Sequence, residues 1–503
     1  MYIQPNTTIK LYKNVPLDTS YEHTLWFNNV SEQNNYFHGS SNILILTLQK
    51  GTYQRVVKGS MRVGVSADTI YNCNYLAFQN TNYGTKWFYA FVTGVEYVNN
   101  SASEITFEVD VMQTYLFDTT LKDCFVEREH TSNDTIGTNI NPEPVELGDY
   151  VCDSMDGTQK MAQYSIVLAS TGIENLFPYK GGSYGGVFSG CSYKVYPNNQ
   201  SGWAELSDLL DNITSQLFSD RIVGIFCMPT CFVTEQGGTA KTYDISKPKS
   251  VSKIGSYVPR NNKLLTYPYN FLSVNNAQGV EIDYRYEFFS SDDCKFILGG
   301  DMSMSCKSIL APYNYKGIPV NYEELISMDC AVQSSYNVTS FVGGVANNTL
   351  STAMSIANTP KENKKGEKNA NYDSSLSRNV IGGGANIVSD IIHSSNYHGS
   401  STPSTLMALG IRDYMFLTKH ITETFAQQID DFFDKYGYAT NRVKVPNRNV
   451  RAQWTYCKTN GCVLVGNAPA DDVRRMCQIY DKGITFWKNP SNVGNYSLGN
   501  GIV

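Results

Sequence analysis

Alternating apolar and polar positions characterise the first part of the chain. In residues 105–111, ITFEVDV, every second residue is apolar, and residues 61–65, MRVGV, alternate in the same way. This period of two is typical of a strand with one buried face. The aromatic run at 86–98, KWFYAFVTGVEYV, predicts a further strand with a bulge or close approach at Gly94. The pattern therefore predicts a β region over residues 1–135.

A second period, of three to four residues, indicates helices later in the chain. Residues 203–218, WAELSDLLDNITSQLF, carry apolar residues at helical spacing and predict a short amphipathic helix. Residues 411–436 show the same spacing over a longer stretch, and Gly437 follows where a C-terminal cap belongs. We therefore expect one long helix over 411–436, followed by short strands and a small helix around 468–480.

These patterns predict a mainly β, multi-domain chain with some α structure. The length of 503 residues gives room for about three domains, and the aromatic content of 13% favours sheets over helical bundles. Residues 131–148 are polar with two prolines and indicate a domain boundary. The expected parts are an N-terminal β domain (1–135), a middle α+β domain (150–330), a separate segment (336–410) and a C-terminal helix with strands (411–503).

The segment differs in composition from its surroundings. Residues 330–360 contain no Lys, Arg, Asp or Glu, and after the cluster KENKKGEK at 361–368 two more uncharged stretches follow, 379–389 and 391–411. Over the whole chain, by contrast, charged residues make up 17%. Asn, Ser, Thr and Gly interrupt the segment too often for a transmembrane helix, which needs about 20 mostly apolar residues. It is also too apolar for an ordinary flexible linker.

Charge and cysteine usage narrow the functional classes. The formal net charge is −6, whereas proteins that hold nucleic acid are normally basic because they neutralise phosphates. The 12 cysteines are scattered, and their closest pairs, Cys227/Cys231 and Cys457/Cys462, lack zinc-site spacing and nearby histidines. We expect no metal, no cofactor and reduced thiols. The first ten residues, MYIQPNTTIK, do not read as a secretory signal, which fits synthesis in a cytoplasm.

Candidate chemical motifs are weak. The glycine-rich runs at 181–186 and 382–384 lack the Lys-Ser/Thr of a P-loop and the acidic partner of a dinucleotide site. VEREH at 126–130, with Cys124 nearby, could form an acid–base or thiol–imidazole site, but charged residues on an exposed strand face are the commoner interpretation. No serine-elbow, HExxH or DxDxDG signature occurs. The motifs predict that the chain is not an enzyme.

Several stretches, taken in order, carry a specific resemblance. They are NYGTKWFYAFVTGVEYV, FEVDVMQTYLFD, VEREH, FFDKYGYATNRVKVPN, and DKGITFWKN followed by VGNYS. Together they resemble the tail knob (distal tail tube) proteins of phi29-like short-tailed bacteriophages, the small podoviruses of Gram-positive hosts. The resemblance is close over residues 5–130 and 411–497, and looser between them, where TYPYNF at 266–271 is the clearest shared stretch.

The resemblance implies a virion protein at the tail tip, assembled in the host cytoplasm. Six copies would close into a hollow cylinder that joins the adjoining tail proteins. The terminal regions would form the tube wall and the middle region the knob. Double-stranded phage DNA would pass through the lumen without specific binding. The segment at 336–410 would be a long loop that plugs the lumen and then penetrates the host cytoplasmic membrane.

The residues expected to act in the membrane are apolar side chains, which would face lipid, and glycines, which let the loop change shape. In the six-copy bundle the Asn, Ser and Thr groups would be buried around a pore, and KENKKGEK would stay at the polar tip. The expected membrane-penetrating residues are Phe341, Val342, Gly343, Gly344, Val345, Leu350, Met354, Ile356, Val380, Ile381, Gly382, Gly383, Gly384, Ile387, Val388, Ile391 and Ile392.

Three alternatives stay open at this point. The uncharged segment could be a disordered surface loop, although its lack of charge argues against that. The middle region could bind a receptor or a cell-wall polymer through an aromatic, Asn-rich surface, alone or together with the tube role. A cell-wall hydrolase is the third alternative, and the motifs give it no support.

Overall fold

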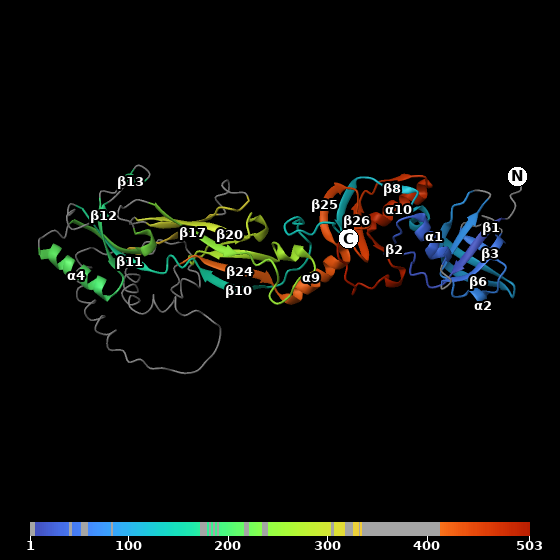
Figure 1. Cartoon of the computed structure of the whole chain (residues 1–503), viewed down its shortest axis with the longest axis horizontal. Coiled ribbons are helices and arrows are strands. Elements are labelled where there is room, and N and C mark those ends of the chain that lie inside the picture. The colour runs from blue at the N-terminus through green and yellow to red at the C-terminus, as the bar shows by residue number, and fades with distance from the viewer. Residues whose placement is uncertain are drawn as a thin grey trace, which may run out of the picture. The chain divides into compact units, whose positions relative to one another are not determined.

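The structure of the chain, a computed structural model, is mostly β and describes most of the sequence. The described residues are 6–39, 43–51, 59–81, 84–171, 179–180, 183–184, 187–188, 191–215, 221–233, 240–302, 306–316, 325–330, 332–333 and 413–503. The chain divides into two compact units (Figure 1). Unit 1 contains Met1–Glu146, Tyr257–Leu264 and Thr424–Val503, and unit 2 contains Leu147–Ser256 and Leu265–Glu423.

An antiparallel sheet forms the N-terminal part of unit 1. Its strand order is β3-β1-β5-β6-β7-β4. The inner strands are buried on both faces: Leu11, Leu76 and Ala90 enter one apolar cluster, whereas their neighbours Tyr12 and Tyr75 enter another. The strands are β1 (Thr7–Tyr12), β3 (Leu44–Gly51), β4 (Ser60–Val63), β5 (Tyr75–Asn80), β6 (Phe88–Asn99) and β7 (Ala102–Val109).

The predicted irregularity at Gly94 is confirmed. The pairing of β6 with β7 shifts register between Val92 and Gly94, which is a bulge or similar irregularity. A Cβ atom at Gly94 would lie 2.7 Å from Oγ1 of Thr106, so a side chain here would displace the Thr106 hydroxyl.

The C-terminal part of unit 1 completes the second apolar cluster with Trp454 and Trp487. A five-stranded sheet has the order β2-β28-β26-β9-β25, and β8 pairs with β27. Its elements are β2 (His23–Leu25), β8 (Thr119–Leu121), β9 (Cys124–Glu129), β25 (Tyr438–Lys444), β26 (Trp454–Asn460), β27 (Leu464–Gly466) and β28 (Ile484–Trp487). The described helices of unit 1 include α1 (Val30–Gly39), α2 (Ala67–Ile70), α3 (Val111–Tyr115), α9 (Glu423–Tyr436, in unit 1 from Thr424 onward) and η7 (Pro490–Asn492). They also include α10 (Ala470–Lys482), which is the small helix expected around 468–480.

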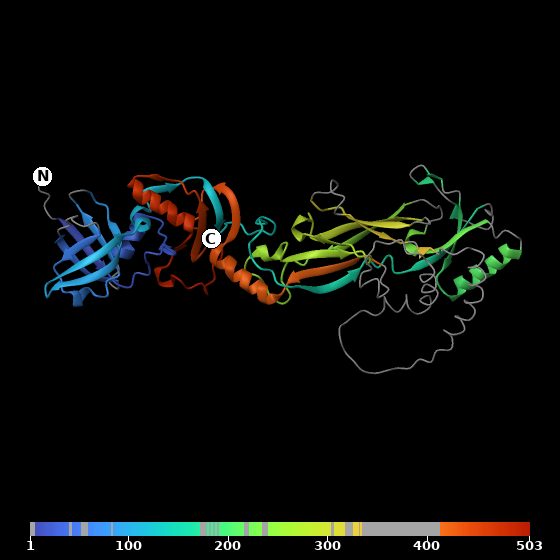
Figure 2. The same ribbon diagram turned by 180° about the vertical axis from the view of Figure 1, so that it is seen from behind.

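The described part of unit 2 contains three larger sheets and the helix α4 (Gln200–Ser215), which confirms the helix expected from residue 203 (Figures 1 and 2). The first sheet has the order β10-β24-β18-β19, with β10 (Tyr150–Gly157), β24 (Met415–Ile421), β18 (Asn270–Asn275) and β19 (Glu281–Tyr284). The second is β17-β20-β21-β22, with β17 (Ala240–Pro248), β20 (Asp293–Asp301), β21 (Lys307–Pro312) and β22 (Ile326–Asp329).

The third sheet of unit 2 has the order β12-β15-β11-β16-β23, and the hairpin β13–β14 stands by itself. Residues from all three larger sheets share one apolar core, which includes Val167, Phe296 and Phe416. The remaining elements are β11 (Tyr164–Ser170), β12 (Tyr179–Lys180), β13 (Ser183–Tyr184), β14 (Val187–Phe188), β15 (Ser192–Pro197), β16 (Ile222–Pro229), β23 (Val332–Gln333), η3 (Thr230–Phe232) and η5 (Tyr286–Phe288); η4 (Asn262–Leu265) lies where the chain leaves unit 1.

The helix predicted over 411–436 is wrong in its first half. Residues Met415–Ile421 form β24, and helix α9 begins only at Glu423 and ends at Tyr436. β24 lies between β10 and β18, so its backbone is hydrogen-bonded on both sides, and this tertiary pairing overrides the helical spacing of its apolar residues. The C-terminal end is as expected: Gly437 has φ +67° and donates its N–H to the carbonyl of Phe433 at 2.8 Å.

Candidate functional site

The predicted membrane-penetrating residues, from Phe341 to Ile392, all lie outside the described residues, as does the charged cluster KENKKGEK. Their assignment stays a prediction. The structure does describe where the chain enters and leaves this region. Strand β23 pairs with β16, with Val332 opposite Cys227, and the described chain resumes at Asp413 and Tyr414, immediately before β24. We call residues 326–330 with 332–333, and residues 413–414, the two roots of the segment.

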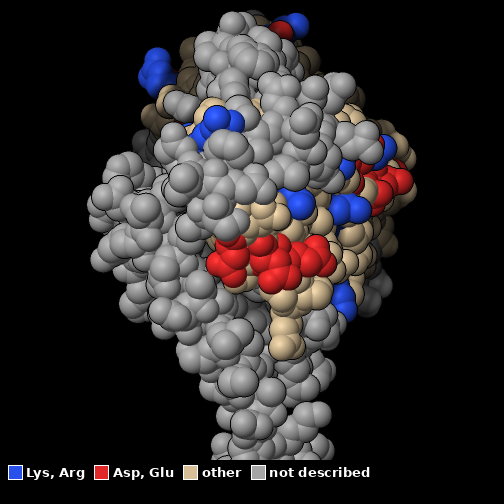
Figure 3. All heavy atoms as spheres, turned by 90° about the vertical axis from the view of Figure 1, so that its left-hand side faces the viewer, with Lys and Arg blue, Asp and Glu red and all other residues tan. Residues whose placement is uncertain are grey.

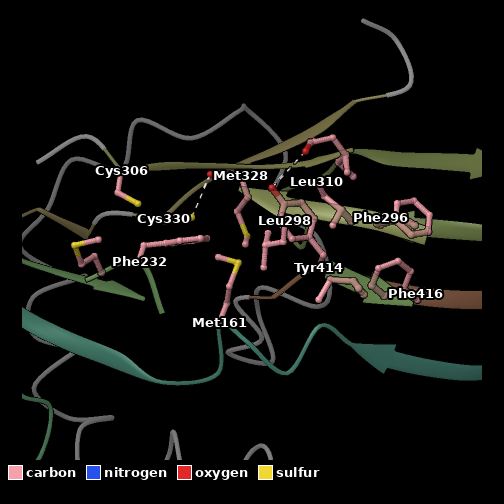
Figure 4. Close-up of a cluster of buried hydrophobic side chains, with 14 of the residues drawn as sticks. Met161, Phe232, Phe296, Leu298, Cys306, Leu310, Met328, Cys330, Tyr414 and Phe416 are labelled. Atoms are coloured by element: carbon pink, nitrogen blue, oxygen red, sulfur yellow. Dashed lines mark hydrogen bonds between the residues drawn. The ribbon is translucent and has the colours of Figure 1, made fainter. Parts of the chain in front are cut away.

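The two roots meet in the core of unit 2 (Figure 4). The hydroxyl of Tyr414 lies 2.9 Å from the carbonyl of Ser308, 3.0 Å from the Ser308 hydroxyl and 3.3 Å from the carbonyl of Ile326. The thiol of Cys330 lies 3.0 Å from the same Ser308 hydroxyl. Burial raises the pKa of Tyr414 well above its usual value, so its hydroxyl keeps its proton and donates. Ser308 thus connects the roots on both sides of the uncharged segment.

Two thiols face each other at the first root. The backbone N–H of Cys330 bonds to the carbonyl of Cys306 at 2.8 Å, and both side chains are buried and free. Contact with Cys330 and burial raise the pKa of Cys306, which keeps this thiol neutral. A neutral buried thiol packs as a small apolar group and is a poor nucleophile.

A buried carboxyl group fixes the second root. Asp413 accepts hydrogen bonds from the Thr158 hydroxyl, from the Gln159 N–H at 3.0 Å and from the Tyr414 N–H at 2.8 Å. A Cβ atom at Gly157 would come within 2.8 Å of the Asp413 carboxylate, so the glycine gives it room. Burial raises the pKa of Asp413 to about 6, because the desolvation of the carboxylate outweighs these hydrogen bonds, which lower the pKa.

Unit 1 contains a different polar site, centred on the buried face of α9. Asp430 accepts from the hydroxyl of Tyr257 at 2.6 Å, from the N–H of Arg260 at 2.8 Å and from the side-chain amide of Asn261 at 2.8 Å. Arg260 also forms an ion pair with Asp434, at 2.6 Å. These contacts bind the short segment Tyr257–Leu264 to a helix that lies about 170 positions later in the sequence.

Glu143 extends this network from the region predicted to be a domain boundary. Its fully buried carboxylate pairs with Arg128 and Lys263 and accepts the N–H of Ala439 at 2.7 Å. The division between units falls just after it, between Glu146 and Leu147. Sequence reasoning missed Glu143 because it stands in a polar, proline-containing stretch, and its partners are distant in sequence. The one signal of this site in the sequence is the domain boundary predicted over residues 131–148.

The VEREH stretch has a structural role. His130 is buried; its Nδ1 accepts the N–H of Tyr456 at 2.7 Å and its Nε2 donates to the carbonyl of Asp434 at 3.0 Å. Burial lowers the pKa of His130 to about 3, so the ring stays neutral with both nitrogens occupied. Glu129 is buried too and contacts Lys444 and the N–H of Asn447, at 2.5 Å and 2.7 Å.

The interpretation of VEREH as an exposed charged face is therefore wrong for Glu129 and His130. It holds better for Glu127, which is one-third exposed and forms an ion pair with Lys458 at 2.5 Å. Cys124 is buried, and burial raises its pKa. No pair of these side chains is arranged as a nucleophile and its base among the contacts that the structure describes.

The outer surface of unit 2 carries an acidic face. The exposed positions of α4 include Glu205, Asp208 and Asp211, and acidic side chains gather on the side of the molecule where this helix lies (Figures 1 and 3). Such a face repels phosphate. Within the described part of the chain, no group of His, Cys, Asp and Glu could hold a metal ion. The helices that the structure describes include none that is long and apolar enough to cross a membrane.

Comparisons with known proteins match both ends of the chain. Residues 236–501 match the family model of the C-terminal domain of the Bacillus phage phi29 tail knob protein gp9, and residues 5–120 match that of the caudoviral major tail protein N-terminus. The tail knob protein gp9 of Bacillus phage B103 is 25% identical over 608 aligned positions, which cover 99% of this chain and 98% of that protein. The gp9 protein of phage phi29 is 24% identical and covers 98% of each chain.

A solved structure shows a similar fold. It is that of the bacteriophage C1 tail knob protein, gp12, with a TM-score of 0.65 and 14% sequence identity. The similarity covers 99% of this chain and all of that one.

Proposed function

The chain belongs to the phi29 gp9 family of tail knob proteins, and from this premise we propose that six copies form a hollow tube at the tip of a phage tail. The family match covers 266 of 503 residues, from 236 to 501. The protein is thus a structural component of the virion tail that associates with other tail proteins. Its relatives are named as tail knob proteins, in agreement with the prediction that it is not an enzyme.

We propose that unit 1 forms the tube wall and unit 2 the knob. Unit 1 combines the first 146 residues with the last 80, Thr424–Val503, and this supports a wall made from both terminal regions. The C-terminal contribution to the wall would then begin at Thr424 rather than at residue 411, because β24 belongs to unit 2. In a closed ring, neighbouring copies cover strand edges that one copy leaves open.

The tube would conduct double-stranded DNA without holding it. Each fixed cation that contacts a phosphate adds attraction and slows passage. The net charge of −6 supports this assignment, since an acidic chain does not favour retention of a polyanion.

The uncharged segment would fill the lumen and then enter the host cytoplasmic membrane. The observation that carries this proposal is the absence of charge over residues 330–360 in a chain of this family. Six copies could satisfy one another's Asn, Ser and Thr groups and present apolar side chains to lipid. The contacts among Tyr414, Ser308 and Cys330 support it from the described side, because they fix both roots within one core.

A double substitution at the start of the segment tests the membrane role. Phe341→Asp with Val342→Asp places twelve carboxylates in a six-copy bundle, and each costs about 2.5 kcal/mol or more near the bilayer centre. We expect normal tube assembly and normal adsorption of phage, but no DNA delivery and no dye release from liposomes.

The matched control adds two carboxylates in and directly beside the charged cluster, as Asn363→Asp with Asn369→Asp, and should retain DNA delivery. If the Phe341/Val342 variant ejects its genome at the normal rate, the segment acts as a plug or spacer and has no membrane role.

A further inference from the structure

Two strands of unit 2 stand at the open borders of their sheets. β10 is the first strand of β10-β24-β18-β19, and β17 is the first strand of β17-β20-β21-β22. Among the described strands, each is paired on one side only, β10 with β24 and β17 with β20. They are similar in length, with eight and nine residues. An edge of this length presents unpaired backbone N–H and C=O groups to any strand that can approach.

The β10 edge is unusually exposed. Its first five residues, Tyr150 to Ser154, are all exposed, and Tyr150 and Val151 are 44% and 40% accessible. Folded proteins normally protect such an edge with lysine, proline or a covering element, because apolar side chains on a free edge promote association. β10 contains no lysine and no proline. Figures 1 and 2 both show it along the border of unit 2.

The two edges carry opposite charge. Residues 149–157 contain three aspartates and no cation, whereas residues 240–249 contain three lysines and one aspartate. Within one chain, Lys247 of β17 already lies 3.9 Å from Asp156 and 3.3 Å from the carbonyl of Gly157, so a β17 lysine does pair with a β10 acid. Asp149, Asp153 and Lys241 stay exposed. Opposite charge on two edges favours their pairing and disfavours the pairing of each edge with itself.

We propose that β10 of one copy pairs along its open edge with β17 of a second copy, so that the two sheets join into one eight-stranded sheet across the subunit boundary. Because the two edges are different surfaces, the contact is head-to-tail and can be repeated around a ring. Main-chain hydrogen bonds would supply affinity, and the charged side chains would set which edges meet. The inference rests on the proposed ring and assigns one of its interfaces.

Cys152 provides a native probe. Of the 12 cysteines, all of which the structure describes, it is the one that is exposed, and it lies in β10. Wild-type protein, which carries Cys152, is mixed with a partner that carries Cys152→Ser and one new cysteine on β17, at Thr242, Asp244 or Ser246. These three positions are exposed. The mixture is assembled, oxidised and run on a denaturing gel without reductant.

We expect a disulfide-linked dimer in the mixture for at least one of the three β17 positions, and none when either protein is oxidised alone. Since the two cysteines are on different chains, a cross-link within one copy cannot produce the dimer. A maleimide should also label Cys152 at least tenfold more slowly in the assembled protein than in the separate chain.

Light scattering on the same samples separates the possible failures. If rings form but no β17 position cross-links, or if Cys152 is labelled equally fast in both states, the β10–β17 contact is wrong and the ring stands. If Cys152 is protected only in the complete virion, another tail protein covers β10, and the proposal is again overturned. If the chain stays monomeric at every concentration, the ring and this interface both fail.

Discussion

Each of the two units is stabilised internally by a different kind of contact. Around α9, unit 1 buries carboxylates such as Asp430 and Glu143 with cationic and amide partners. Around Tyr414, unit 2 has an apolar core in which one phenol, one serine and one thiol are hydrogen-bonded. Unit 1 consists of three separate chain segments. Directional charged contacts can select one arrangement of such segments, which apolar burial alone does less well.

The largest effect should follow from removing the central carboxylate of unit 1. Asp430→Ala leaves the donors of Tyr257, Arg260 and Asn261 without their buried acceptor, and we expect a loss of about 4 kcal/mol in the free energy of unfolding of unit 1. Urea unfolding followed by tryptophan fluorescence measures it, because four of the five tryptophans belong to unit 1.

Asp431→Ala is the matched control. Its side chain is 74% exposed, so we expect a change within about 0.5 kcal/mol. Equal losses for the two variants would contradict the role given to buried charge in unit 1.

The second expected effect is a pH dependence of stability that differs between the two units. Burial raises the pKa of Asp413 to about 6, whereas the ordinary value is 3.8. The folded state therefore binds the proton more tightly, and this group's stabilisation is complete below pH 3.8 and is lost as the pH rises through 6. Asp413→Asn should remove a pH-dependent difference of about 3 kcal/mol between pH 4 and pH 7.

Hydrogen exchange of β24 peptides at both pH values reports the stability of unit 2 in the wild type and in the Asn variant. In unit 1 two groups oppose each other: burial raises the pKa of Asp110 to about 6 and lowers that of His130 to about 3. His130 contributes stability above pH 6.5 that is lost as the pH falls toward 3. The contributions of these two groups should partly cancel, and a parallel pH profile of Asp413→Asn and wild type would refute the assignment for unit 2.

A smaller effect should follow from removing the hydroxyl of Tyr414, which contacts the other root of the segment. Tyr414→Phe removes the hydroxyl shared with Ser308 and Ile326 and leaves buried polar atoms unpaired, at a cost of about 2 kcal/mol to unit 2. Hydrogen exchange of β21 and β22 measures the loss. Tyr313→Phe, at a tyrosine that is 46% exposed, should change nothing measurable. If Tyr414→Phe is equally silent, the hydroxyl does not connect the roots.

The smallest effect is expected at the exposed acid of VEREH. Glu127→Gln breaks a surface pair with Lys458 and should cost less than about 0.5 kcal/mol. Glu129→Gln, two residues later, weakens buried contacts with Lys444 and Asn447 and should cost about 2 kcal/mol. Thermal unfolding of both variants decides whether burial separates these neighbouring acids.

The sequence patterns correctly predicted those elements whose structure depends on residues that are close together in the sequence. Alternation identified β4 and β7, the bulge at Gly94 followed from a glycine within an aromatic strand, and helical spacing identified α4. The same spacing failed at β24, since the two strands that flank it come from distant parts of the sequence.

The polar sites could not be predicted for the same reason. Asp430 and Arg260 are 170 positions apart, and Tyr414 and Ser308 are 106 apart. A single charged residue in sequence gives no sign of whether a partner will arrive, so Glu129 and His130 resembled surface residues. The family resemblance, which depends on several ordered stretches, supplied the function that isolated motifs did not contain.

The mass and symmetry of the purified protein test the central claim most directly. Light scattering combined with electron microscopy should show particles of six times the 56.1 kDa chain mass, with six-fold symmetry and density inside a central lumen. A stable dimer or trimer, or a six-fold particle without a central channel, would contradict the proposed tube.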